Sequence, residues 1–354
     1  MLALLPLAVV PLSAALHYLV GASPFWVFAT ASIGVMALAY HISNATEAVA
    51  ETAGPAIGGL LNVSFGSVAE LVLAIFVLAD GHATVVRAQI TGSIIGTGLL
   101  GLGLAILVGG LAREKQVFKR ERAGLLSTLL IVVLIALLLP AVFDMVIRSH
   151  PNGVDVALSD EHLSLGVSAV LLALYAGNLV YTLITHRNVF SRQGGEAEGK
   201  GGSLWLPLAI MVGGTAVLAF EAELVSGALE ATASQLHLSP LFLGVVVLAL
   251  VGTSADLFAA VLFAHRDRMD LVMDICIGSA IQIALVVAPL LVVASFLLGQ
   301  PMTLVFANPL DLFAIAATAF IVNSVAADGE TTWFEGLLLV GVYALLALAF
   351  LFAG

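Results

Sequence analysis

Charged side chains are scarce in this sequence. Only 10% of the 354 residues are Asp, Glu, Lys or Arg, whereas 61% are hydrophobic, and the mean hydropathy is +1.14. A water-soluble domain carries roughly 25% charged residues, which cover its surface. Because this chain has far fewer, most of its surface must face lipid rather than water.

Cysteine and basic residues are scarce as well. The single cysteine, Cys276, lies in an apolar stretch, which excludes an intrachain disulfide and a CxxC metal site. Twelve Lys and Arg residues against 23 Asp and Glu give a net charge of -11, which argues against nucleic acid as a partner. No HExxH or GxSxG sequence occurs, so no motif supports an intramembrane protease or hydrolase, and we expect a protein that is not an enzyme.

Apolar stretches of about 20 residues, enough to cross a hydrocarbon core of roughly 30 Å, recur along the chain. They predict an all-α integral membrane protein of about eleven transmembrane helices. Residues 1–19 lack a basic N-terminal region and an A-x-A-like cleavage site, so we interpret them as a first membrane helix rather than a signal peptide. The predicted spans are 4–21, 24–42, 55–80, 84–111, 122–147, 163–186, 204–231, 239–265, 269–298, 303–326 and 333–353.

One polar segment divides the chain. Residues 187–203 (RNVFSRQGGEAEGKGGS) form the only long polar stretch, and their glycine and charge content predicts a flexible linker. We therefore divide the chain into an extra N-terminal helix (1–22), a first five-helix unit (23–187), a cytoplasmic linker (188–203) and a second five-helix unit (204–354).

The basic residues fall mainly on one side of the predicted membrane, where three loops hold ten of the twelve, and only Arg87 and Arg148 lie on the other side. Because cytoplasmic loops are enriched in Lys and Arg, this pattern predicts a cytoplasmic N-terminus and an outside C-terminus. We expect a multi-pass protein of a bacterial inner membrane. The ten residues are Arg113, Lys115, Lys119, Arg120, Arg122, Arg187, Arg192, Lys200, Arg266 and Arg268.

Two segments, 38–74 and 218–260, resemble each other. Each contains an acidic helix, a polar break, and an apolar helix interrupted by small residues that end in a carboxylate, GSVAE at Glu70 and GTSAD at Asp256. The two units begin on opposite sides of the membrane, which predicts inverted repeats (helices 2–6 and 7–11), a recurring design of secondary transporters. A Gly-Ser pair follows each cluster, at Gly92-Ser93 and at Gly278-Ser279.

Glu70 and Asp256 are the candidate metal-binding residues. Each lies mid-span, where an ionised group is costly and usually serves a transport pathway, and their helices contain no Lys or Arg. Two facing carboxylates bind a cation or, without one, take up protons, because burial and mutual repulsion disfavour two charges. A site that holds either a metal ion or protons is the chemical basis of an exchanger.

Neutral oxygens near these carboxylates suit a hard cation such as Ca2+, which takes six to eight oxygen ligands. Helix breaks at Gly66 and Gly252 would free backbone carbonyls, and the lack of Cys and His there disfavours zinc or copper. Small polar residues also pack membrane helices, and glutamine hydrogen-bonds between them, so that alternative stays open. The candidate side-chain ligands are Ser67, Thr253, Thr97 and Gln282.

Two pairs of acids are spaced to share a helix face: Glu47 with Glu51, four apart, and Glu223 with Glu230, seven apart. A funnel of carboxylates would concentrate cations at the mouth of a pathway. The alternative is that these acids are solvated residues at helix ends. We interpret other polar residues as solvated or interfacial, among them His41, His82, Asp144 and Asp311.

At these residues the chain resembles the calcium/cation–proton exchanger family, within the larger cation/Ca2+ exchanger group. Residues 45–71 (ATEAVAETAGPAIGGLLNVSFGSVAEL) are similar to that family's first repeat, where GGLLNATFGN precedes the functional Glu. Residues 240–261 (PLFLGVVVLALVGTSADLFAAV) are similar to its second repeat, which bears GNAAEH. Residues 277–292 and 324–350 also resemble later helices of the family, so the resemblance covers helices 2 to 11.

The resemblance implies an eleven-helix antiporter without a resident cofactor, in which Ca2+ and protons are the cargo. Glu70 and Asp256 would be the ligands, with Gln282 nearby and the four paired acids along the access paths. The chain departs from the family pattern at four positions, and these changes bear on ion selectivity and coupling. Ser67 and Thr253 replace Asn, Asp256 replaces Glu, and Leu257 replaces His.

We therefore expect exchange of a divalent cation, Ca2+, for protons by alternating access around one midplane site. The expected partners are the lipid bilayer, cations and protons. Two alternatives stay open: an antiporter for Na+ or Mn2+, because Asp replaces the family's Glu, and a cation channel lined by the same acids. Channels more often build such rings from several subunits than from an inverted repeat in one chain.

Overall fold

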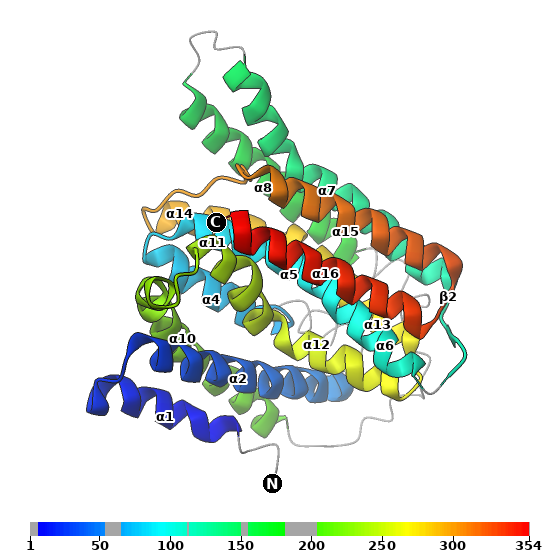
Figure 1. Ribbon diagram of the computed structural model, residues 1–354, viewed down its shortest axis with the longest axis horizontal. Helices are drawn as coiled ribbons and strands as arrows, with labels where there is room; N and C mark the ends of the chain where they lie inside the picture. The colour runs from blue at the N-terminus through cyan, green and yellow to red at the C-terminus, as the bar shows by residue number, and fades with distance from the viewer. Residues whose placement is uncertain (1–5, 54–64, 112, 150–154, 181–203, 354) are drawn as a thin grey trace.

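The computed structural model describes residues 6–53, 65–111, 113–149, 155–180 and 204–353, and these are mostly helical (Figure 1). A first short helix consists of η2 (Pro6–Ala8), α1 (Val9–Ala15) and the π-helical η3 (Leu16–Val20). The first unit follows, with one span built from α5, η4 and α6 in succession. Its helices are α2 (Pro24–Ala53), α4 (Val68–Ala79), α5 (Ala83–Ile95), η4 (Gly96–Gly101), α6 (Leu102–Gly110), α7 (Arg120–Ser149) and α8 (Val156–Val180).

The second unit has the same plan, with two spans that each contain a π-helical segment. Its helices are α10 (Trp205–Leu236), α11 (Pro240–Phe242), η6 (Leu243–Leu248), α12 (Ala249–His265), α13 (Met269–Gln282), η7 (Ile283–Val287), α14 (Ala288–Leu297), α15 (Pro309–Asp328) and α16 (Trp333–Ala353). In the described part of the chain, nine helices are long and apolar enough to span a membrane, and two shorter apolar helices, Val9–Val20 and Val68–Ala79, bring the number to eleven. The predicted all-α fold is confirmed.

Several predicted helix boundaries are wrong. The second helix continues to Ala53 rather than ending at residue 42, and the sixth begins at Val156 rather than at 163. The tenth begins at Pro309, because the Asn308 side chain accepts a hydrogen bond from Leu310 N (2.9 Å) and caps the helix there. The start of the third predicted span (55–64) and the linker (188–203) lie outside the described residues.

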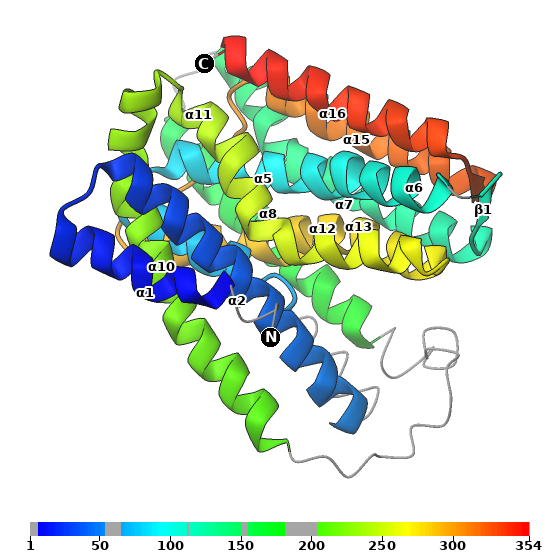
Figure 2. The same ribbon diagram turned by 60° about the horizontal axis from the view of Figure 1, so that its bottom comes forward.

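The contacts between helices follow the two repeats. Equivalent helices pack together, α2 against α10 and α7 against α15. Other contacts come in matching pairs. α10 packs against α4, and its equivalent α2 packs against α12, the equivalent of α4. In the same way, α16 packs against α6, and α8 packs against α14. Two like units that interlock about a pseudo-two-fold axis produce this pattern, which confirms the inverted repeats. The extra helix α1 lies on α2 and α10 at one side of the molecule (Figures 1 and 2).

Glycines let helices of different repeats approach backbone to backbone. A Cβ on Gly92 of α5 would overlap the carbonyl oxygen of Val245 in η6. In return, a Cβ on Gly244 of η6 would lie 2.8 Å from a carbonyl oxygen of α5, and α6 meets α16 in the same way at Gly103 and Gly336. Since small residues permit close packing of helices in a membrane, these positions fix α5 against η6 at the centre of the protein.

Loops that carry basic residues meet at one end of the molecule. β1 (Gln116–Val117) pairs antiparallel with β2 (Glu330–Thr331) and joins the loop after α6 to the loop after α15. Arg113 Nε lies 3.4 Å from Asp267 Oδ1 of the loop after α12. Lys115 Nζ donates a hydrogen bond to Glu330 at 2.7 Å, which raises the pKa of the exposed Lys115 ammonium. The loops between helices 4 and 5 and between helices 8 and 9 therefore share one side, as the charge pattern predicts.

Candidate functional site

Glu70 lies where the first unit changes from turn to helix. Gly66 and Ser67 form a turn, α4 begins at Val68, and Glu70 occupies its first turn. The N-terminus of a helix favours an anionic side chain, yet only 3% of the surface of Glu70 is exposed. The predicted break at Gly66 is confirmed, and it positions a carboxylate at a helix start inside the protein.

A glycine of the second repeat accommodates this side chain. A Cβ on Gly252 of α12 would lie only 2.7 Å from Glu70 Cγ and 3.3 Å from its Cα. Real Cβ atoms do not approach other carbons so closely, so Gly252 is the residue that lets Glu70 lie against α12. The small-residue cluster of one repeat thus packs against the stem of the acidic side chain of the other.

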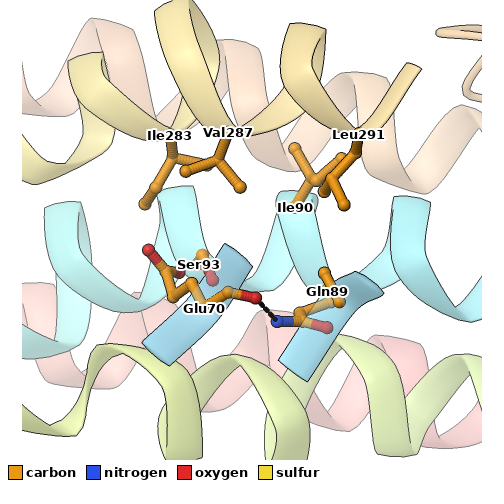
Figure 3. Close-up of a pocket in the computed structure, with 8 residues that line it drawn as sticks. Glu70, Gln89, Ile90, Ser93, Ile283, Val287 and Leu291 are labelled. Carbon is orange, nitrogen blue, oxygen red and sulfur yellow. Dashed lines mark hydrogen bonds between the residues drawn. The ribbon is translucent and has the colours of Figure 1, made fainter. Parts of the chain in front are cut away.

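Polar side chains of α5 lie next to Glu70 (Figure 3). The Ser93 hydroxyl lies beside the Glu70 carboxylate, and Gln89 Nε2 donates to the backbone carbonyl of Glu70 at 3.4 Å. The small pocket that these residues line has no room for a water molecule. Apolar side chains close it, namely Ala74, Ile90, Ile283, Val287 and Leu291.

Asp256 supplies the second carboxylate. It lies within α12, is partly buried, and has the Ser279 hydroxyl of α13 as its polar neighbour. The Glu70 and Asp256 carboxylates are close enough to interact electrostatically. Among the described residues, neither forms an ion pair with a Lys, Arg or His side chain. The two predicted ligands therefore meet in the interior, one from each repeat.

Unsatisfied oxygens gather around the two carboxylates. Buried polar atoms in folded proteins are nearly always hydrogen-bonded, so a group of them without partners marks a place where a cation or a proton can bind. No group of three or more His, Cys, Asp or Glu side chains in the described part of the chain could hold a metal ion, and a cation here depends on neutral oxygens as well. Among the described residues, the buried oxygens without a hydrogen-bond partner include five on the segments of this site, namely Ser67 Oγ, Glu70 Oε1, Gln89 Oε1, Ser93 Oγ and Ser279 Oγ.

The other predicted ligands lie on the same helices. Thr97 Oγ1 donates to Ser93 O, and Thr253 Oγ1 donates to Ala249 O, both at 2.8 Å, so each hydroxyl oxygen keeps its lone pairs. Gln282 is the last residue of α13, about one turn after Ser279. The predicted break at Gly252 is wrong, because α12 runs unbroken from Ala249 to His265. The wide turns of η6 precede it instead.

The predicted access-path acids lie at two places. Glu47 and Glu51 both lie in the last two turns of α2, which continues to Ala53; Glu47 is partly buried, and the side chain of Glu51 lies outside the described residues. Glu223 and Glu230 are exposed on α10. Glu230 Oε1 lies 3.7 Å from Nδ1 of His82, so this histidine is not simply solvated.

Several polar residues were misjudged or missed by sequence reasoning. Asp144 and Asp311, interpreted as interface residues, are 7% and 4% exposed. Ser93 and Ser279 appear in the sequence analysis only as members of the Gly-Ser pairs. Their matching positions in the two repeats indicate a matching role, which is to lie beside the carboxylate. Glu221 is a buried acid that the sequence analysis does not predict. The helical spacing of the apolar residues around it indicates its burial, because the same buried face of α10 holds Leu218, Ala222, Val225 and Leu229.

Known proteins resemble this chain along almost its whole length. Residues 23–184 and 206–352 match the family described as sodium/calcium exchanger protein. A Ca(2+)/H(+) antiporter of Aphanothece halophytica is 38% identical over 341 residues, which are 92% of this chain and 90% of the relative. The Ca(2+)/H(+) antiporter ChaA of Bacillus subtilis is 35% identical over 328 residues, 91% of each chain.

Solved structures share the fold. The structure of native YfkE matches with a TM-score of 0.84 and 32% identity, over 99% of this chain and 100% of that one. The H+/Ca2+ exchanger CAX has the same fold, with a TM-score of 0.72 and 16% identity, over 99% of this chain and 93% of that one. The family match and the extent of the curated relatives confirm the resemblance, and the chain belongs to the sodium/calcium exchanger protein family.

Proposed function

We propose that this protein is a secondary antiporter that exchanges Ca2+ for protons at the Glu70–Asp256 site. The observation that carries the proposal is the meeting of two carboxylates, one from each repeat, with no basic partner among the described residues and with unsatisfied oxygens around them. The names of the relatives, Ca(2+)/H(+) antiporters at 35–38% identity, support Ca2+ and protons as the cargo.

The charge of the site explains why exchange is obligatory. Two carboxylates with one divalent cation are electrically neutral, and so are two carboxylic acids. Two empty carboxylates carry two negative charges in an apolar interior, which is strongly disfavoured. The site therefore moves between its two neutral forms, and the cation is released only as protons arrive.

Neutral oxygens and the repeat symmetry complete the mechanism. Ser67, Thr253, Thr97 and Gln282, together with Ser93 and Ser279, supply oxygens for a hard cation. Alternating access follows when the two repeats move against each other, so that the site opens first to one side of the membrane and then to the other. The acids of α2 and α10 concentrate cations along the two approaches.

The membrane and the orientation are part of the same proposal. We place the protein in the lipid bilayer of a bacterial inner membrane, with the β1–β2 end and the N-terminus in the cytoplasm and the C-terminus outside. The concentration of basic residues at that end supports this orientation. With a proton gradient directed inward, exchange then expels Ca2+.

Proton movement in proteoliposomes that hold a pH gradient tests the proposal. Ca2+, Mn2+ and Na+ are added separately to the wild-type protein and to Asp256→Asn. We expect Ca2+ to collapse the gradient with the wild type and to have no effect with the variant. Collapse by Na+ alone would keep the antiporter and change its cargo. Ca2+ uptake without proton movement would indicate a channel and overturn the proposal.

A further inference from the structure

Glu221 is an acid in the interior that the Glu70–Asp256 site does not use. It lies in the middle of α10, and its exposed fraction is 0%. Its side chain reaches across to the extra helix α1, where both of its oxygens contact the hydroxyl of Ser13, at 2.7 and 2.9 Å. Three helices enclose this contact, since α1 packs on both α2 and α10 at one side of the molecule (Figures 1 and 2).

Gly34 of α2 makes room for the carboxyl group. A Cβ at this position would lie 2.9 Å from Glu221 Oε2 and 3.0 Å from Cδ. Any larger residue would displace the side chain of Glu221. The enclosure is therefore built from all three helices, with a glycine on one, a serine on another and the acid on the third.

Counting hydrogens shows the charge state that this geometry needs. Ser13 Oγ lies within hydrogen-bond distance of three oxygens, namely Val10 O at 2.7 Å and the two of Glu221. A serine hydroxyl has one hydrogen, and both a backbone carbonyl and a carboxylate can only accept. The one hydrogen of Ser13 cannot serve the 2.7 Å contacts to Val10 O and to Glu221 Oε1 at the same time, so a second hydrogen, carried by the Glu221 carboxyl group, completes the set.

In the described part of the chain, no Lys, Arg or His side chain forms an ion pair with Glu221. Burial and the Ser13 hydroxyl are the two influences that act on this group, whereas an ionised carboxylate in an apolar enclosure needs a cationic partner or several donors. The titratable groups that neighbouring segments bring to α10 are His17 and Tyr18 of η3, Tyr40, His41, Glu47 and Glu51 of α2, Glu70 of α4, and Asp80 and His82 after α4, which contact Ser226 and Glu230.

We propose that Glu221 is a second proton-binding site, separate from the Glu70–Asp256 site, and that its protonated carboxyl group fastens α1 to α10 through Ser13. Raising the pH removes this proton, and the single hydrogen of Ser13 cannot then serve both Val10 O and the Glu221 carboxylate. One short contact loses its hydrogen bond and an ionised carboxylate is left in an apolar enclosure, so α1 loosens from α2 and α10. Acid therefore closes this interface and alkali opens it, whichever cation the protein transports.

Infrared difference spectroscopy of the full-length protein in lipid, titrated with pH, detects a protonated carboxyl group directly. We expect wild type minus Glu221→Gln to contain a carboxylic acid C=O band at neutral pH that disappears at alkaline pH. The Ser13→Ala variant keeps the acid but removes its partner, so the band shifts in frequency. Glu223→Gln, which removes an exposed acid two residues away, is the matched control, and we expect no carboxylic acid band in its difference spectrum at neutral pH.

Hydrogen–deuterium exchange supplies the structural readout. Protection of the α1 amides, residues 9–15, should fall at alkaline pH in the wild type and stay constant in Glu221→Gln, whose amide still donates to Ser13. A spectrum at neutral pH without a Glu221-dependent band, or equal loss of α1 protection in both proteins, overturns the proposal. Neither the infrared band nor the hydrogen–deuterium exchange requires Ca2+ transport. A failure of the proposed exchange activity can therefore be distinguished from a failure of this proposal. If Glu221→Gln does not fold, an unshifted carboxylic acid band in Ser13→Ala overturns the proposal.

Discussion

The two repeats bring the same kinds of residue to the central site in different settings. Glu70 lies in the first turn of a helix, is buried, and rests directly on Gly252. Asp256 lies inside an unbroken helix and is only partly buried. The glycines of the matching Gly-Ser pairs differ as well: Gly92 lies against the backbone of η6, whereas no atom lies within 4 Å of a Cβ built on Gly278.

The difference shows that an inverted repeat does not give an evenly divided site. The Glu70 half is enclosed by close packing, so its geometry is fixed by the fold. Asp256 is only partly buried, and three of the four departures from the family pattern, Thr253, Asp256 and Leu257, lie in its half. We infer that the first half sets the position of the cation and that the second half adapts to it.

The largest effect is expected from Glu70→Gln, which removes the charge of the enclosed half while keeping its shape. We expect exchange to fall to background, a loss beyond the roughly 10–100-fold that removal of an outer-shell partner costs a metal site. Ca2+-driven proton movement in proteoliposomes measures it, and gel filtration confirms folding. Glu121→Gln, at an exposed position on α7, is the control. Wild-type exchange by Glu70→Gln would contradict the assigned site.

The glycine pair provides the next comparison, now on stability. In Gly92→Ala the new methyl group meets the carbonyl of Val245, so we expect a loss of about 1–3 kcal/mol in the free energy of unfolding. In Gly278→Ala it meets nothing, and the better helix propensity of alanine stabilises by up to about 1 kcal/mol. Thermal unfolding of the two variants in detergent measures the contrast. Equal melting temperatures would show that the tight packing of α5 on η6 is not required.

A smaller effect should separate the two serines beside the carboxylates. Ser93→Ala removes an oxygen from the enclosed half, and we expect the half-saturating Ca2+ concentration to rise about 10-fold. We expect a smaller rise for Ser279→Ala, because water can replace the lost hydroxyl near the partly buried Asp256. Initial rates of exchange at several Ca2+ concentrations measure both. The reverse order would assign the enclosed role to the second half.

The smallest effect is expected from Asp256→Glu, which gives both halves the same acid and restores the family's residue. Because Asp256 is only partly buried, we expect exchange to persist with the half-saturating Ca2+ concentration changed by less than about tenfold, equivalent to ~1.4 kcal/mol. The same assay with Mn2+ and Na+ shows whether the added methylene alters selectivity. Loss of all exchange would mean that the second half is as rigid as the first.

Much of this architecture was predictable from the sequence. The spacing of apolar runs indicated the helices, and the distribution of basic residues placed two loops at the same end. The carboxylates after the small-residue clusters made Glu70 and Asp256 the candidate ligands, because an unpaired acid inside an apolar run is costly and usually serves a transport pathway. These inferences depend on composition and on the spacing of apolar and charged residues, both of which can be read from a single sequence.

What escaped prediction depends on how helices pack. A glycine such as Gly252 reads as a helix break, but here it is a gap that the Glu70 side chain fills, and only the neighbouring helix reveals this. Likewise, Glu223 and Glu230 share a face by spacing, whereas the buried acid of α10 is Glu221. Which face is buried depends on α1 and α2, and sequence period alone does not contain that information.

The pairing of β1 with β2 has a consequence for which substitutions this junction tolerates. The two loops are held together by the main chain, including a hydrogen bond from Phe118 N to Gly329 O at 3.0 Å. Main-chain hydrogen bonds do not depend on the identity of the side chain. Exposed positions such as Val117 can therefore be substituted while the two loops stay joined. Proline is the substitution that this junction forbids at Phe118, since it removes the donor.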